Sequence, residues 1–148
     1  MKYILFICIR NAGRSQMTQG IFNHYKKTLP IVDRSYEAIS AGITPSSRVG
    51  STSSEVMKEI GIDMSDSSEY YPKKVDEEML RKSEMVICLD RTINNSDLYG
   101  YTPDEIWDVE DTYNKSVETI RGVRKDIRTR CANLFETLYR NERIAATL

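Results

Sequence analysis

The sequence predicts an α/β fold in which a parallel sheet carries helices on its faces. Two short apolar runs, Tyr3–Ile7 and Met85–Leu89, are rich in β-branched or aromatic residues, which favours buried strands. Segments with helical spacing alternate with these and other strand candidates, an order typical of doubly wound sheets. The 148 residues are enough for one sizeable core. We therefore expect a single domain over residues 1–148.

The first part of the chain contains two strands joined by a helix. The strand Tyr3–Ile7 leads into a helix from about Arg14 to Lys27, and Pro30 closes the connection that follows. Tyr36–Ser40 is predicted to be the second strand, with Gly42 at its exit. Since active sites in such sheets lie at the carboxyl ends of the strands, the loop after the first strand is the first place to look for chemistry.

The middle of the chain is mostly irregular. Thr44–Ser54 is rich in Ser, Thr, Pro and Gly, which predicts a surface loop. Thr52 begins a capping box and Gly61 suits a helix C-terminus, so a short helix is predicted over Glu55–Ile60. The polar segment Asp63–Lys74 is expected to be irregular.

The last part of the chain supplies two further strands and the clearest helix. A helix over Asp76–Ser83 precedes the strand Met85–Leu89, and Glu105–Val109 is the fourth strand candidate. A long helix begins near Ser116. Its apolar stripe consists of Val117, Ile120, Val123, Ile127, Cys131, Leu134 and Leu138. This spacing makes Cys131 a core residue.

Composition excludes several classes of function. The net charge of −1 implies no bulk attraction to nucleic acid or to a membrane. No stretch approaches the roughly 20 apolar residues of a membrane span, and the N-terminal apolar run lacks a signal-peptide cleavage site. We expect a cytoplasmic protein.

Cysteine and histidine usage narrows the chemistry further. The three cysteines, Cys8, Cys88 and Cys131, are scattered without CxxC spacing, which disfavours a disulfide framework and a zinc site. The only histidine, His24, is expected on the exposed side of the first helix. We therefore expect no metal and no cofactor, and a nucleophile–histidine pair only if His24 takes part in it.

The loop after the first strand combines a nucleophile with an anion-binding geometry. Its sequence is Cys8, Ile9, Arg10, Asn11, Ala12, Gly13, Arg14 and Ser15. A loop that curls into a helix N-terminus points several backbone N–H groups into one concavity, where the helix dipole adds positive potential. Asn11 and Gly13 tolerate the unusual backbone angles that such a cradle needs.

The side chains of this loop indicate group transfer. Arg14 can bind two oxygens of a tetrahedral oxyanion, and the field of the cradle together with Ser15 would stabilise a thiolate at Cys8. The alternative is an inert buried Cys8 and a solvated Arg14, because free cysteines are usually structural. The joint pattern of strand, Cys-x5-Arg-Ser and helix favours a transfer site.

The chain resembles the low-molecular-weight protein tyrosine phosphatase family, which includes thioredoxin-coupled arsenate reductases. The Cys-x5-Arg-Ser loop, Ser40-Ala41-Gly42 after the second strand and Val86 to Asp90 at the third carry the resemblance, which extends from about Tyr3 to Leu138. It implies a four-stranded parallel sheet in the order 2-1-3-4 and a cysteinyl-phosphate mechanism.

The resemblance also implies an acid, because such a mechanism must protonate the departing oxygen. Asp111-Thr112-Tyr113 takes the place of the family's Asp-Pro-Tyr, which makes Asp111 the general acid, with Glu110 or Asp108 as alternatives. Thr112 in place of proline puts the rigidity of this loop in question. A solvated acidic turn is the competing interpretation.

Supporting roles follow from the same resemblance. Tyr113 is expected to form an aromatic wall beside the pocket, and Ser40 to hydrogen-bond Asn11. Asp90 is expected to brace a loop rather than react. Two interpretations are open for Tyr70 and Tyr71: both border the mouth of the pocket, or both are surface tyrosines of a variable loop.

The chain departs from the family pattern at several positions. Arg10 replaces a glycine and either adds positive charge at the pocket mouth or narrows it. Gly13 stands where many members have a second cysteine. Asp66 lies in a segment where the family has Ser-His, so the bracing of the site there must differ.

Two enzymatic functions and one binding function are compatible with these residues. The first is a phosphomonoester hydrolase, a protein tyrosine phosphatase that acts on a phosphotyrosine protein or a small aryl phosphate. The second is an arsenate reductase, in which Cys88 resembles the second cysteine of the redox relay. Residues 89–100 contain no third cysteine, which favours the phosphatase. A non-catalytic phosphate-binding module is the weakest, because nucleophile, arginine and acid are all present.

Overall fold

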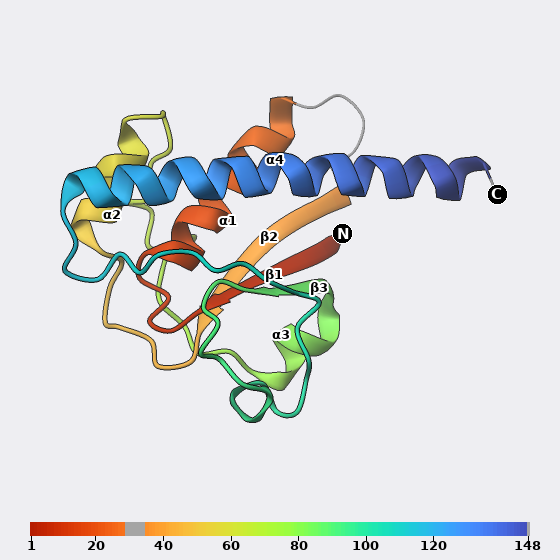
Figure 1. Cartoon of the computed structure of the whole chain (residues 1–148), viewed down its shortest axis with the longest axis horizontal. Coiled ribbons are helices and arrows are strands. Elements are labelled where there is room, and N and C mark those ends of the chain that lie inside the picture. The colour runs from red at the N-terminus through yellow and green to blue at the C-terminus, as the bar shows by residue number, and fades with distance from the viewer. Residues whose placement is uncertain (29–34, 148) are drawn as a thin grey trace.

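The computed structural model describes residues 1–28 and 35–147 and confirms the predicted α/β fold (Figure 1). Its sheet contains β1 (Lys2–Cys8), β2 (Tyr36–Gly42), β3 (Ser83–Cys88) and β4 (Glu105–Ile106). All pairs are parallel and the order is β2-β1-β3-β4, as expected. Because β1 lies between β2 and β3, the loop that follows it opens at the carboxyl edge of the sheet, between two neighbouring strand ends.

The helices cover the two faces of the sheet unequally (Figure 1). The helices α1 (Arg14–Tyr25), α2 (Ser51–Lys58) and α4 (Val117–Thr147) lie over one face, whereas α3 (Glu77–Lys82) lies over the other. Two short 3-10 turns occupy Lys26–Thr28 and Asn95–Leu98. Pro30, which was expected to close the connection after α1, lies outside the described residues.

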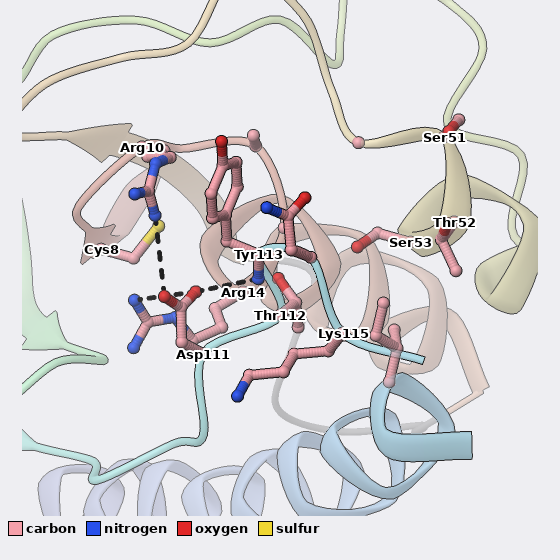
Figure 2. Close-up of a pocket in the computed structure, with 15 residues that line it drawn as sticks. Cys8, Arg10, Arg14, Ser51, Thr52, Ser53, Asp111, Thr112, Tyr113 and Lys115 are labelled. Carbon is pink, nitrogen blue, oxygen red and sulfur yellow. Dashed lines mark hydrogen bonds and ion pairs between the residues drawn. The ribbon is translucent and has the colours of Figure 1, made fainter. Parts of the chain in front are cut away.

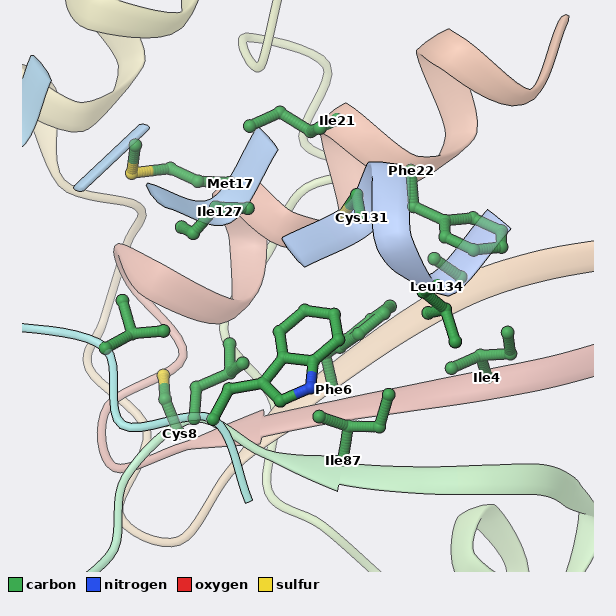
Figure 3. Packing of buried hydrophobic residues seen from close by; sticks show 14 of the residues in the cluster. Ile4, Phe6, Cys8, Met17, Ile21, Phe22, Ile87, Ile127, Cys131 and Leu134 are labelled. Carbon is green, nitrogen blue, oxygen red and sulfur yellow. The ribbon is translucent and has the colours of Figure 1, made fainter. Parts of the chain in front are cut away.

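Alternation along β1 divides the core into two apolar clusters. Ile4, Phe6 and Cys8 face the cluster under α1, α2 and α4, which Figure 3 shows. Leu5 and Ile7 face the smaller cluster, which includes Leu80 of α3. Cys88 belongs to this second cluster. Since side chains of a strand alternate between faces, the chain has Cys8 and Cys88 on opposite faces of the sheet.

Some predicted boundaries were wrong. The fourth strand covers only Glu105–Ile106, although Trp107 N still donates to Cys88 O of β3, and the side chains of Trp107 and Val109 are buried in the core. α2 starts at Ser51 rather than at Glu55, and its N-cap is Gly50, without a side-chain cap. The predicted capping box at Thr52 is therefore not formed.

The long C-terminal helix largely confirms its prediction. Ile120, Ile127, Cys131 and the other stripe residues are buried, and Cys131 is a core residue. Val117 is exposed because it is the first residue of the helix, ahead of the turns that pack on the sheet. His24 is half-buried rather than exposed, with its ring edge-on to Tyr25. Among the described helices, none is long and apolar enough to cross a membrane.

Candidate active site

The loop between β1 and α1 turns its carbonyl groups outward, where each finds a donor. Cys8 O, Ile9 O and Arg10 O accept hydrogen bonds from Ile43 N, Thr44 N and Ser46 N, and Ala12 O accepts one from Gly50 N at 2.8 Å. No partner within residues 1–28 and 35–147 is found for the N–H groups of residues 12–15. The concavity of the loop is thus lined with unpaired donors at the start of α1, the geometry that binds oxyanions.

Asn11 holds the tightest bend of the cradle. Its φ of +51° is in the left-handed region, which asparagine tolerates better than most residues. Gln16 Nε2 donates to the Asn11 carbonyl and to its Oδ1, and Lys73 N donates to the same Oδ1 at 3.0 Å. The predicted bond from Ser40 to Asn11 was wrong: the Ser40 hydroxyl donates to Gln19 Oε1 at 2.6 Å.

Two glycines are needed for close approach rather than for unusual φ. Gly13 has a φ of −130°, and a Cβ on it would lie 2.0 Å from Thr112 Oγ1. Gly42, at the end of β2, would bring a Cβ to 2.8 Å from Ile9 O. The φ of Gly13 is therefore ordinary, but with its ψ of −86° the residue lies outside the main allowed regions, and the missing side chain makes room for the loop that carries Asp111.

Cys8 lies at the floor of the cradle, 2% exposed. Its Sγ accepts a hydrogen bond from Asn11 N at 3.3 Å and lies 2.9 Å from Ser15 Oγ. Asn11 Nδ2 donates to Ser15 Oγ at 2.7 Å. Because the Ser15 oxygen already accepts that bond, its own proton is free to point at the sulfur and stabilise a thiolate.

Arg14 is buried and braced from one side. Its Nη1 donates to Leu89 O, to Asp90 Oδ2 and to Val109 O, each at 3.0–3.1 Å. Asp90 also accepts bonds from Thr92; burial opposes ionisation of Asp90, but the bonds from Thr92 and Arg14 outweigh it and lower its pKa. Asp90 therefore braces its own loop through Thr92 and also, which was not expected, Arg14, whose Nε and Nη2 remain for an oxyanion.

Asp111 is the one member of the acidic cluster that lines the same cavity as Cys8 (Figure 2). Its carboxylate lies 3.6 Å from both Arg10 Nη1 and Arg14 Nη2, and it accepts a bond from Tyr113 N. Glu110 is exposed, and Asp108 pairs with Arg91 at 3.9 Å away from the cavity. The geometry thus favours Asp111 over the two alternatives.

Arg10 and Tyr113 form the mouth of the cavity. The Arg10 guanidinium carbon lies 3.9 Å from the centre of the Tyr113 ring, so the two groups stack. Both side chains line the cavity, as Figure 2 shows, and its volume is about 250 Å³. Tyr70 and Tyr71 line a different groove, and Tyr70 is buried. Neither interpretation of this pair was therefore right for Tyr70.

The other two cysteines do not line the cavity: Cys88 pairs with Ile7 across the β1–β3 ladder, on the face of the sheet opposite to Cys8, and Cys131 lies in α4. Burial raises the pKa of Cys88 to about 12, and burial raises the pKa of Cys131 as well. Within residues 1–28 and 35–147, no group of three metal-ligating side chains lies close enough to hold a metal ion.

Sequence reasoning missed the residues that hold the cradle from outside. Gln16 and Gln19 lie in the first turns of α1 and are buried, although both are polar. Polar side chains at consecutive buried turns of a helix were the available signal, but their partners, Tyr71 O and Glu69 O, are far away in sequence. Such pairings appear only once the chain is folded.

A Cys-x5-Arg loop at the carboxyl end of a central parallel strand defines a class of enzymes that bind oxyanions against a cysteine. The model of the family "Low molecular weight phosphotyrosine protein phosphatase" matches residues 3–144. The chain belongs to this family.

Known relatives include both phosphatases and arsenate reductases. A low molecular weight protein tyrosine phosphatase from T. tengcongensis superposes with a TM-score of 0.80 at 31% identity, over 93% of this chain and 100% of that one. An arsenate reductase in the phosphate binding state superposes with a TM-score of 0.75 at 27% identity, over 93% and 99%. The glutaredoxin arsenate reductase of Synechocystis sp. is 32% identical over 90% of this chain and 96% of its own length.

Proposed function

We propose that the protein is a phosphomonoester hydrolase, a cytoplasmic protein tyrosine phosphatase that acts through a cysteinyl-phosphate intermediate. The observation that carries the proposal is the cavity that contains both Cys8 and Asp111, while Cys88 is buried on the other face of the sheet. This arrangement supplies a nucleophile and an acid for phosphoryl transfer but no second thiol in the same cavity.

The first step transfers the phosphoryl group to sulfur. The Cys8 thiolate attacks phosphorus, an S–P bond forms, and the P–O bond to the leaving group breaks. Asp111 gives its proton to the departing oxygen, and the unpaired N–H groups with Arg14 hold the three remaining oxygens. Tyr113 at the mouth would contact the aromatic ring of the substrate.

The second step releases phosphate. Asp111, now a carboxylate, takes a proton from a water molecule while the oxygen of that water attacks phosphorus. The S–P bond breaks, which returns the Cys8 thiolate. Ser15 and Asn11 N stabilise that thiolate as the leaving group.

Arsenate reduction is the second candidate, favoured by the names of the relatives. Reduction of arsenate to arsenite needs two electrons, which two thiols supply as they form a disulfide. Cys88 lies on the opposite face of the sheet, with a pKa raised to about 12 by burial, and is poorly placed for this role. A reductase would therefore need a thiol from outside the chain, such as glutathione.

The experiment that tests the proposal assays one preparation in parallel. Hydrolysis of aryl phosphates is measured beside arsenate reduction, the latter with thioredoxin and with glutathione plus glutaredoxin. We expect hydrolysis that Cys8→Ser abolishes while phosphate still binds, since the cradle is made of backbone groups and Arg14. Cys88→Ala serves as the matched control and should leave hydrolysis intact.

Two outcomes would contradict the proposal. Arsenate turnover without aryl phosphate hydrolysis would assign the chain to the reductases. Substantial hydrolysis by Cys8→Ser would remove Cys8 as the nucleophile.

A further inference from the structure

The N-terminus of α2 opens into the same cavity as the phosphate cradle. Its N-cap is Gly50, which offers no side-chain cap, and its first turn contains no acidic residue. In the described part of the chain, the N–H groups of Ser51, Thr52 and Ser53 have no partner, and all three residues line the cavity. Three unpaired donors at a helix N-terminus favour an anion.

Ser53 adds an independent indication of a ligand. The residue is 97% buried, since its exposed fraction is 3%. No hydrogen bond joins its hydroxyl to another residue in the ranges 1–28 and 35–147. Figure 2 shows this hydroxyl pointing into the cavity, toward the loop of Thr112. Because this oxygen opens to the cavity and has no partner in the described part of the chain, it is available to a ligand there.

The α2 terminus is fixed to the cradle and shares its positive potential. Gly50 N donates to Ala12 O at 2.8 Å, so the starts of α1 and α2 are joined directly. The Ser53 oxygen would lie 3.3 Å from a Cβ placed on Gly13. Arg10, Arg14 and Lys115 line the cavity against one carboxylate, that of Asp111. The charged side chains that line the cavity are therefore predominantly cationic.

We propose that the N-terminus of α2 is a second oxyanion subsite, and that the substrate carries a second anionic group next to its phosphomonoester. The subsite consists of the N–H groups of residues 51–53 and the Ser53 hydroxyl. The inference rests on the proposed function, because it names the substrate class for the same cavity. The second group is a carboxylate or a further phosphoryl group.

The first experiment compares matched substrates. Values of kcat/KM are measured for 3-carboxyphenyl phosphate and for 3-carbamoylphenyl phosphate, which has nearly the same shape without the charge. We expect the charged substrate to be favoured by about 3-fold or more, as one charge at a helix N-terminus should give, mainly through KM. Phosphotyrosine peptides with a neighbouring Glu, Gln or phosphoserine then distinguish a carboxylate from a second phosphoryl group.

A variant that fills the subsite with its own carboxylate gives the sharpest test. Gly50→Asp places an anion at the N-cap, where φ is −64° and ψ is 131° and a Cβ meets nothing nearer than 3.4 Å. Aspartate is favoured at such a position, so the variant should fold. We expect it to remove the preference for the charged substrate, whereas Gly50→Ala should retain it.

Ser54→Asp is the matched control for charge alone. Ser54 N already donates to Gly50 O, and Ser54 does not line the cavity. It should therefore retain most of the preference. Equal loss in Ser54→Asp and Gly50→Asp, or no preference in the unaltered protein, would overturn the subsite.

A binding experiment distinguishes failure of the proposed function from failure of the subsite. If no aryl phosphate is hydrolysed, binding of 3-carboxyphenylphosphonate and 3-carbamoylphenylphosphonate is compared by calorimetry for the same variants. A preference for the charged phosphonate that only Gly50→Asp removes would support the subsite even then, and equal binding of the two would overturn it.

Discussion

Cys8 and Arg14 are both nearly fully buried, at 2% and 4% exposure, although one is proposed to ionise and the other is always charged. Buried charge persists only where neighbouring groups replace water. Arg14 has three acceptors on one side, and Cys8 has Asn11 N and Ser15 as donors. At the residue scale the site is therefore a set of polar groups that are held by hydrogen bonds from the protein on one side and face one cavity on the other.

Arg14→Lys is predicted to reduce kcat/KM for aryl phosphates by about 10²-fold or more. An ammonium keeps the charge but cannot reproduce the planar fork, and loss of a preorganised donor typically costs 10²–10³ in rate. The measurement is steady-state kinetics with phosphate inhibition on the same variant. Arg91→Lys is the control, because Arg91 is exposed and pairs only with Asp108 among the described residues. Near-normal kinetics for Arg14→Lys would place the arginine outside the reaction.

Asp111→Asn is predicted to slow hydrolysis by roughly 10²–10⁴, the usual span for general acid catalysis. The loss should grow as the leaving group becomes more basic, because good leaving groups depart without a proton. The measurement is kcat/KM across substituted phenyl phosphates for both proteins. Glu110→Asn is the control, since Glu110 is exposed and does not line the cavity. If kcat/KM of Asp111→Asn depends on the basicity of the leaving group as it does in the unaltered protein, another residue must be the general acid.

At the scale of elements, the sequence predicts which segments form strands and helices, but not which distant residues they contact. The strand–loop–helix unit from Lys2 to Tyr25 was predictable, because apolar pattern and Cys-x5-Arg spacing are local signals. The start of α2 was not, because the bond from Gly50 N to Ala12 O fixes it across 38 residues, from 12 to 50. The partner of Ser40 was missed for the same reason: Gln19 reaches it only after α1 packs on β2.

Among these contacts between distant segments, the one between the cradle and the Asp111 loop is the most sensitive to an added side-chain atom. Gly13→Ala is predicted to destabilise the protein by about 1–3 kcal/mol, because the new Cβ would lie 2.0 Å from Thr112 Oγ1. Thr112→Ala should recover much of that loss, since it removes the clashing oxygen and leaves Thr112 Cβ at 3.2 Å. Urea unfolding of the two single variants and the double variant measures this coupling.

Gly122→Ala is the matched control for this cycle. A Cβ at Gly122 of α4 meets nothing within 4 Å, so alanine should stabilise the helix by about 0.5–1 kcal/mol. Strictly additive effects at residues 13 and 112 would show that the two side chains do not compete for one space.

At the scale of the whole molecule, the site lies where three separate parts of the chain end on one edge of the sheet. Arg14 begins α1, Leu89 and Asp90 follow β3, and Val109 follows β4, so the bonds of one guanidinium connect all three. The order of the strands is what brings these ends together, and the family resemblance predicted that order correctly. We therefore expect that loss of the hydrogen bonds of Arg14 would lower both the stability of the fold and the activity.

Asp90→Asn is predicted to destabilise the fold by about 1.5–3 kcal/mol at pH 7, the usual worth of a hydrogen bond to a charged group. The pKa of Asp90 is lowered in the folded protein, because bonds from Thr92 and Arg14 outweigh the effect of burial. A lowered carboxyl pKa adds stability above the unfolded value of about 3.9, and this stability is lost as pH falls through the folded pKa. The penalty of the substitution should therefore be full at pH 6–7 and shrink below about pH 4.

Urea unfolding at pH 7, 5 and 3 measures this difference, with Asp108→Asn as the control. The pair between Asp108 and Arg91 is 3.9 Å apart and largely exposed, so its loss should cost less than about 1 kcal/mol at any pH. A penalty for Asp90→Asn that stays constant from pH 7 to 3 would show that the carboxylate charge does not stabilise Arg14. The contact would then be a neutral hydrogen bond, and the brace on the guanidinium would come from Leu89 O and Val109 O alone.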